Sequence, residues 1–245
     1  MRLIVAAAGI VAVSWCSSAL ADDQPCYGMP ALGVDAGAVP HLATVTPGDR
    51  ARFVRGSEQA GCPNASAACA MRAFVVGGDA VVVTATAGDY ACATFTGPGP
   101  KAVSTSGLLL RARLAVPSPE TPVNLSAAWA GTWRSGDEQT ITIQPKPDGH
   151  IVVNGEASWG GHDPDRVKRG GVNVGDLAAE VSIDGGVVAF AIDDDGTTKP
   201  FDKLPADSDV CRVKLWRLGP YLVAADNLRC GGMNVTFTGV YRKIK

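Results

Sequence analysis

Short runs in which apolar and polar residues alternate, each closed by Gly, Pro or Asp, constrain this chain more than any other feature. The clearest example covers residues 210–242, where Val213 and Leu215 share one face of a run that a Gly219-Pro220 break ends. Alternation with a period of two between turn residues is typical of half-buried strands. Helical periodicity is confined to one turn at residues 124–129. We therefore predict an all-β fold.

The first 21 residues have the pattern of a secretory signal peptide. Arg2 provides a basic start, residues 3–13 are apolar, and Ala19-Leu20-Ala21 is a small-residue cleavage site. The apolar segment is too short to span a bilayer of roughly 30 Å, and no later segment is long enough, so we expect no transmembrane segment. Cleavage near Ala21 predicts a mature protein that is periplasmic or secreted.

The mature chain is expected to be slightly acidic and rich in disulfides. Without Arg2 it keeps 21 basic and 24 acidic side chains, a net charge of −3, which gives no electrostatic basis for binding nucleic acid. An even number of cysteines in an exported chain predicts disulfide bonds. The sequence has no C-x-x-C motif and its three histidines are not spaced as metal ligands, so we expect no metal site and no cofactor. The six remaining cysteines are Cys26, Cys62, Cys69, Cys92, Cys211 and Cys230.

We expect these cysteines to pair within each half of the chain. Cys211 and Cys230 would bridge the C-terminal strands and hold their register. The other four allow three connectivities. We favour Cys62–Cys69, which are close in sequence, together with Cys26–Cys92. Cys26–Cys69 with Cys62–Cys92 is the alternative.

A Pro-rich stretch divides the mature chain into two predicted β domains. Its prolines favour extended, semi-rigid geometry, as in a spacer between folding units. The predicted division is a signal peptide (1–21), a lead-in segment (22–61), a first domain (62–115), a linker (116–127) and a second domain (128–245).

The first domain contains strands and turns in a distinctive order. The run 76–83 precedes a Gly88-Asp89-Tyr90 turn, which is followed by strands at 92–95 and 106–109. This order resembles a bacterial SH3-like domain, a small β-barrel. The resemblance implies a cell-wall-binding cleft lined by aromatic residues, for which Phe74, Tyr90 and Phe95 are the candidates. The family's Gly-Trp-Val strand is replaced here by Gly107-Leu108-Leu109.

The second domain begins with Gly131-Thr132-Trp133 and ends with Phe237-x-Gly239-x-Tyr241-Arg242. These ends resemble a lipocalin-like β-barrel. The resemblance implies that Trp133 packs near the barrel base and is covered by Arg242, a cation–π contact of about 1 kcal/mol. An eight-stranded antiparallel barrel would leave no exposed edge. The predicted strands are 131–134, 139–144, 150–158, 176–183, 186–193, 209–217, 220–226 and 234–242.

The richest polar segment of the second domain is the loop at residues 159–171. As a recognition loop at a barrel mouth, it would offer an aromatic residue, a histidine and three cations, and Trp and Arg often dominate interfaces. A solvated inter-strand loop is the alternative. The candidate binding residues are Trp159, His162, Arg166, Lys168 and Arg169.

Catalytic motifs are lacking. Asp193-Asp194-Asp195-Gly196 fails the carboxylate spacing of a calcium loop, and no serine lies in a Gly-x-Ser-x-Gly elbow. We therefore expect a bacterial envelope binding protein rather than an enzyme. Its partner would be peptidoglycan or an envelope protein such as a wall hydrolase. The alternative function is transport of a small apolar ligand in the barrel interior. The sequence leaves the oligomeric state open.

Overall fold

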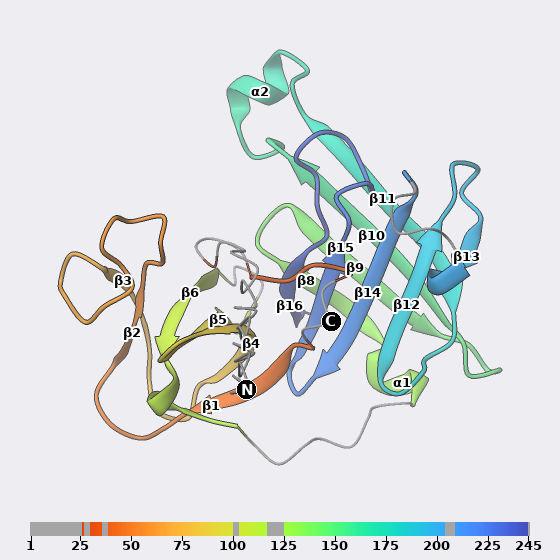
Figure 1. The fold of residues 1–245 in the computed structure, drawn as a ribbon. Coiled ribbons are helices and arrows are strands. Elements are labelled where there is room, and N and C mark those ends of the chain that lie inside the picture. Colours follow the sequence, from red (N-terminus) through yellow and green to blue (C-terminus); the bar gives the residue numbers. More distant parts are fainter. Residues whose placement is uncertain are drawn as a thin grey trace, which may run out of the picture.

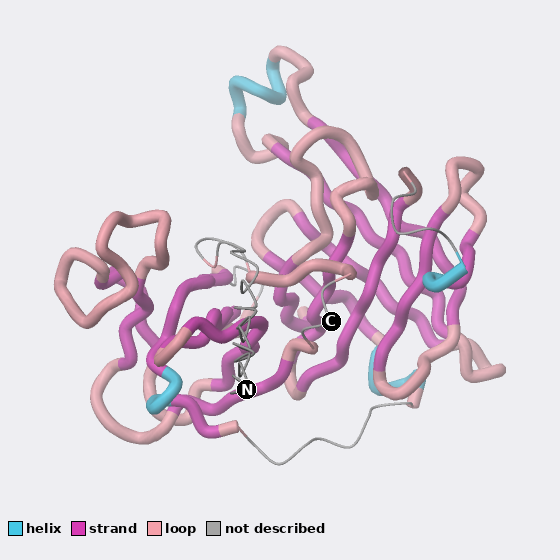
Figure 2. The backbone as a smooth tube through the Cα atoms, viewed as in Figure 1, coloured by secondary structure: helices cyan, strands magenta, loops and turns pink. Residues whose placement is uncertain are grey.

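A computed structural model describes residues 26, 30–35, 39–99, 103–116, 125–203 and 209–244. The described chain is built almost wholly from strands (Figures 1 and 2), which form two antiparallel sheets. The all-β prediction is therefore confirmed. The signal peptide and most of the Pro-rich linker lie outside the described residues.

The first sheet is a curled half-barrel of seven strands, in the order β3-β2-β6-β5-β4-β1-β7. Two of its strands, β1 and β2, come from the predicted lead-in segment, where the sequence predicted a short strand at Ala51–Val54, the bounds of β2, and none at β1. The strands are β1 (His41–Val45), β2 (Ala51–Val54), β3 (Ala70–Val75), β4 (Ala80–Ala87), β5 (Tyr90–Thr96), β6 (Ser104–Leu110) and β7 (Leu114–Ala115).

The second sheet is a nearly closed barrel of nine strands, in the order β11-β10-β9-β8-β16-β15-β14-β12-β13. Pairing of the first strand, β8, with the last, β16, closes one side, whereas no pairing joins the described residues of β11 to those of β12 or β13. The strands are β8 (Gly131–Ser135), β9 (Gln139–Pro145), β10 (Ile151–Trp159), β11 (Asn173–Val181), β12 (Val187–Ile192), β13 (Thr198–Pro200), β14 (Cys211–Leu218), β15 (Tyr221–Asp226) and β16 (Gly239–Lys243).

The predicted eight-stranded barrel was wrong in two places. The short strand β13 was missed, because three residues are too few to show alternation. The last strand begins at Gly239 rather than at residue 234, because the buried Asp226 carboxylate binds the preceding segment. It accepts hydrogen bonds from the Phe237 backbone N–H (2.9 Å) and from the hydroxyls of Thr236 (2.6 Å) and Thr238 (2.8 Å).

Short helical turns complete the fold. They are the 3-10 turns η1 (Arg111–Arg113) and η2 (Phe201–Lys203) and the helices α1 (Ser126–Trp129) and α2 (Pro164–Lys168). The helical turn expected near residues 124–129 is thus present as α1. No described helix is long and apolar enough to cross a membrane.

All three favoured disulfides are confirmed. Cys26–Cys92 ties the N-terminal segment to β5, Cys62–Cys69 closes a short loop before β3, and Cys211–Cys230 joins β14 to the loop before β16. Three disulfides indicate that the protein folds in an oxidising compartment.

The expected cover of Trp133 by Arg242 was wrong. Trp133 is fully buried and its indole N–H donates to the Trp129 carbonyl (3.0 Å), but the guanidinium above its ring belongs to Arg217 of β14, 4.7 Å from the ring centre. Strand register explains the difference. Trp133 lies opposite Lys243, which places the neighbouring Arg242 on the other face of the sheet.

The two sheets share a hydrophobic cluster. The outer faces of β14 and β15 contribute Trp216, Tyr221 and Val223, which pack against Val82 of β4 and Leu32. The Tyr221 hydroxyl also donates to the Ala80 carbonyl (2.7 Å), and the Thr96 hydroxyl donates to the Val240 carbonyl (2.9 Å). Because these outer strand faces are apolar and buried, each sheet covers a surface that water would otherwise contact.

Candidate functional site

The predicted recognition loop forms a projection that we call the α2 arm, residues 159–173. It is carried by the hairpin of β10 and β11, which pair without interruption from Ile151 and Val181 to Trp159 and Asn173. Figure 1 shows α2 standing beyond the end of the barrel. A helix starts here because Pro164 follows Asp163, whose carboxylate accepts hydrogen bonds from the backbone N–H groups of Asp165 (2.9 Å) and Arg166 (3.2 Å).

Arg166 is held over the face of Trp159. Its guanidinium carbon lies 3.9 Å from the centre of the indole ring, and its Nε lies 3.4 Å from the Asp163 carboxylate. The backbone N–H of Arg166 lowers the pKa of the Asp163 carboxyl, because its hydrogen bond favours the charged form. Gly160 makes the stacking possible, because a Cβ at that position would lie 2.6 Å from the Arg166 side chain.

His162 belongs to a neighbouring surface pocket of about 430 Å³. Its backbone N–H donates to the Glu138 carboxylate (3.3 Å), and its Nε2 lies 3.0 Å from the Asp137 carbonyl oxygen. The walls of the pocket are the β8–β9 turn, the base of the arm and the loop before β16. Gln139 ties two of these walls together by donating to the Thr236 carbonyl (2.6 Å).

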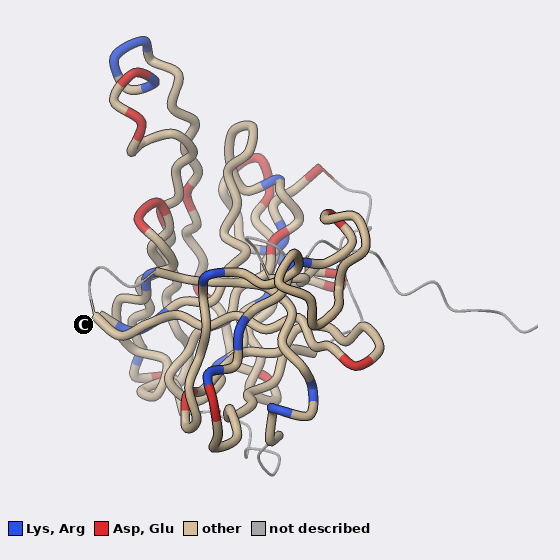
Figure 3. The backbone as a smooth tube through the Cα atoms, turned by 90° about the vertical axis from the view of Figure 1, so that its left-hand side faces the viewer, with Lys and Arg blue, Asp and Glu red and all other residues tan. Residues whose placement is uncertain are grey.

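Lys168 and Arg169 are exposed at the end of the arm. The projecting segment in Figure 3 carries basic and acidic residues close together near its end. The five predicted residues therefore occupy three places: Trp159 and Arg166 stack at the base, His162 turns into the pocket, and the two remaining cations face solvent.

Sequence reasoning missed three exposed apolar side chains, Val174 at the start of β11 and Leu228 and Met233 in the loop before β16. They are 64%, 62% and 78% exposed. Val174 and Met233 are neighbours, because the Asn173 side chain donates to the Met233 carbonyl (2.6 Å) and the Gly232 N–H donates to the Val174 carbonyl (3.0 Å). Because the sequence predicted a strand over residues 234–238, it gave no indication of a loop with exposed apolar side chains before β16.

The loop that carries Leu228 and Met233 is fixed rather than loose. The disulfide Cys211–Cys230 anchors its middle, and Asp226 binds its end through Phe237. Leu228 has a φ of 60°, a backbone conformation that is unfavourable for a branched side chain and persists only where the surroundings impose it.

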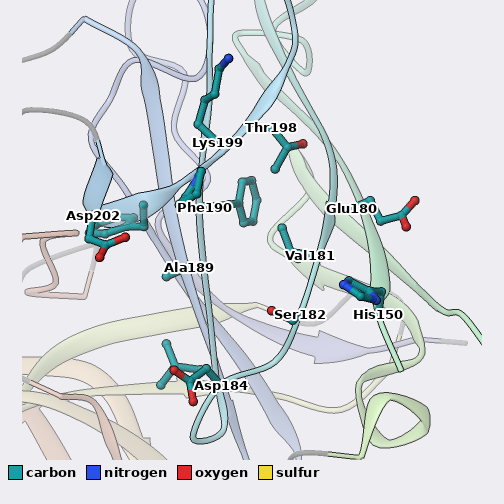
Figure 4. Close-up of a pocket in the computed structure, with 13 residues that line it drawn as sticks. His150, Glu180, Val181, Ser182, Asp184, Ala189, Phe190, Thr198, Lys199 and Asp202 are labelled. Carbon is teal, nitrogen blue, oxygen red and sulfur yellow. The ribbon is translucent and has the colours of Figure 1, made fainter. Parts of the chain in front are cut away.

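Another pocket, of about 610 Å³, lies at the open seam of the barrel. Figure 4 shows Glu180 and His150 on one side of it and Lys199 and Asp202 on the other. Several of its charges are engaged elsewhere: Glu180 pairs with Lys146 (2.5 Å), and Lys199 lies 3.8 Å from Asp193. These side chains do not converge on one point, so the pocket offers no nucleophile and base in contact.

The barrel interior is filled by large side chains. Trp129, Trp133, Phe190, Phe237 and Tyr241 are all fully buried in one cluster with aliphatic residues. Large inward residues fill a small barrel, whereas small ones leave a cavity.

Clusters of three or more His, Cys, Asp or Glu side chains that could bind a metal do not occur in the part of the chain that the structure describes. No family model matches the chain, and searches of curated proteins and of solved structures find no match.

Proposed function

We propose that this chain is an exported binding protein of the bacterial envelope, without catalytic activity, which recognises a protein partner through the α2 arm and the exposed apolar residues Val174 and Met233 beside it. The disulfides and the signal-peptide pattern support export to an oxidising compartment such as the periplasm.

The observation that carries the proposal is the preformed stack of Arg166 on Trp159. Trp and Arg are enriched among residues that dominate binding energy, and residues already held in place lose little conformational entropy on binding. Exposed cations beyond the stack and exposed apolar residues beside it give the combination of a polar rim and an apolar centre that protein interfaces have. The arm carries three cations against Asp163 and Asp165, a net charge of +1, and its exposed Lys168 and Arg169 favour acidic side chains on the partner.

A protein partner is better supported than a cell-wall glycan. Sugar rings bind proteins through open aromatic faces, but Arg166 covers one face of Trp159. The aromatic residues suggested by the SH3-like resemblance do not gather in one cleft either. Phe74 is stacked against Arg50, Phe95 packs on the half-barrel core, and Tyr90 packs against the cluster that contains Cys26 and Cys92.

We also propose that the two sheets are SH3-like and lipocalin-like, respectively. The pairing of β8 with β16, and of most strands with their successors in the chain, supports the second assignment. Transport of an apolar ligand inside this barrel has less support, because buried aromatic side chains occupy the interior.

The proposal is tested by capture with the mature protein, residues 22–245, against envelope extract and against purified peptidoglycan. A captured protein is then purified and its affinity measured. We expect Arg166→Ala with Arg169→Ala to abolish capture at an unchanged melting temperature. Arg52→Ala with Arg72→Ala is the matched control, since it removes two exposed cations from the half-barrel, and it should bind normally. Retention on peptidoglycan that neither variant changes would overturn the proposal.

A further inference from the structure

The chain before β1 contributes a segment that crosses the joint between the two sheets. Residues 26 and 30–35, which we call the clasp, form no strand or helix, yet most of them are buried. Ala31, Leu32 and Val34 are 7%, 5% and 4% exposed. A connecting segment normally runs over the surface, because its backbone has no strand partners. Its side chains therefore have to fix the clasp in place.

Both ends of the clasp belong to the half-barrel. Cys26 forms a disulfide with Cys92 of β5, and Cys26 and Ala31 pack in one cluster with Val54 of β2 and Leu108 of β6. Beyond residue 35 the chain enters β1 of the same sheet. The clasp is therefore a loop that is covalently closed on the half-barrel, and its centre can contact another part of the molecule.

The centre of the clasp packs against the outer face of the second barrel. Leu32 and Val34 lie in the cluster that contains Trp216 of β14 and Tyr221 and Val223 of β15. Those three barrel residues are 7%, 0% and 0% exposed, so almost no water reaches this face. Each buried aliphatic side chain of the clasp therefore stabilises the contact between the sheets through the hydrophobic effect.

A charge pair extends this contact along β14. The Arg212 guanidinium donates to the Asp35 carboxylate (2.7 Å) and lies over the Phe201 ring, 4.1 Å from its centre. Arg212 is only 4% exposed, and alternation along the strand places it on the same face as Trp216. A buried guanidinium that loses its carboxylate is costly to leave unpaired. Asp35 thus holds the end of the clasp on the barrel.

We propose that the clasp locks the two sheets into one unit, so that the Pro-rich linker is not needed to keep them together. Its centre grips the outer face of β14 and β15, while the Cys26–Cys92 disulfide restricts the conformations of the undocked segment. A segment restricted in this way loses less conformational entropy when it docks, so the disulfide strengthens the contact between the sheets. The clasp thereby fixes the barrel and its α2 arm relative to the half-barrel, and this role does not depend on partner binding by the arm.

The test is to cut the linker and measure whether the two halves stay together. A recognition sequence for a site-specific protease replaces residues 118–122 of the mature protein, within the Pro-rich linker. Size-exclusion chromatography of the cut chain over a dilution series then gives the dissociation constant of the two fragments. We expect the wild-type fragments to co-elute at micromolar concentration.

Two clasp variants should weaken this association. Leu32→Ala should raise the dissociation constant about a hundredfold, since it truncates a buried leucine. Asp35→Asn should raise it about tenfold, since the amide no longer neutralises Arg212. Leu110→Ala on β6 and Asp49→Asn in the turn before β2 are the matched controls, because they make the same changes at exposed positions of the half-barrel and should have no effect.

The role of the disulfide is tested separately. Cys26→Ser with Cys92→Ser should raise the dissociation constant about tenfold. Circular dichroism and the melting temperature of each uncut variant check that both sheets are folded. Wild-type fragments that separate at micromolar concentration, or clasp variants that associate as tightly as their matched controls, would overturn the proposal. An unchanged dissociation constant in the double cysteine variant would overturn the role of the disulfide.

Discussion

Replacing Asp226 by alanine should destabilise the protein by about 3 kcal/mol. This carboxylate is 4% exposed and accepts hydrogen bonds from the Phe237 N–H and from the hydroxyls of Thr236 and Thr238. A buried N–H left without a partner costs about 1–3 kcal/mol, and bonds to a charged acceptor contribute about 1.5–3 kcal/mol each before the cost of burying the charge is subtracted. The alanine variant also loses the cost of burying the carboxylate, so the net loss of stability is well below that of three independent hydrogen bonds.

Urea and thermal unfolding of the mature chain measure this loss. For a domain of this size, about 3 kcal/mol corresponds to a fall in melting temperature of about 6–12 °C. Asp226→Asn should lie between the wild type and the alanine variant, because its amide keeps one acceptor oxygen but turns N–H groups toward the hydroxyls. Asp176→Ala on the exposed side of β11 is the matched control. An alanine variant within about 1 kcal/mol of the control would refute the role assigned to Asp226.

Other perturbations have equally definite outcomes. Cys211→Ser with Cys230→Ser removes a disulfide between cysteines 19 residues apart in sequence. This double variant should be about 3 kcal/mol less stable in chemical denaturation, and an unchanged unfolding midpoint would contradict the prediction. Burial raises the pKa of Tyr241 well above its usual value. The stability that depends on the neutral Tyr241 hydroxyl is therefore fully present below about pH 10 and is lost as the pH rises further. Between neutral and strongly alkaline pH, the Tyr241→Phe variant should therefore lose less stability than the wild type. Equal losses in both proteins would contradict a role for ionisation of Tyr241. A fragment of residues 128–245 exposes the apolar faces of β14 and β15, so it should bind the dye ANS more strongly than the mature chain, and equal dye binding would show that the shared cluster is dispensable.

Local patterns in the sequence predicted most of the strands. Residues of β9, β10, β14 and β15 alternate or form apolar runs between turn residues, and these patterns are set by neighbours along the chain. The favoured cysteine pairing was also correct, since proximity in sequence and the division into halves left few alternatives. The loop at residues 159–171 was predicted as a polar segment between strands, and the stack of Arg166 on Trp159 gives it a defined shape.

Long-range contacts explain what sequence reasoning missed. The segment 234–238 alternates like a strand, but the Asp226 carboxylate, 10 to 12 residues before its partners, takes its hydrogen bonds. The face on which Arg242 lies depends on the register of β16 against β8, which alternation alone does not fix. Val223 and Trp216 belong to opposite strands of one hairpin, and their burial requires the other sheet. The exposed residues Val174 and Met233 likewise come close only because β11 meets a distant loop.

Site-specific photo-crosslinking in cells tests the proposed binding surface most directly. A photoreactive amino acid replaces Lys168 at the exposed end of the α2 arm, and the control protein carries it in place of Arg72 on the half-barrel. We predict one defined protein adduct from position 168, absent from the control and lost when Arg166→Ala is added. Adducts at position 72 alone, or an adduct at position 168 that persists without Arg166, would contradict recognition through the arm.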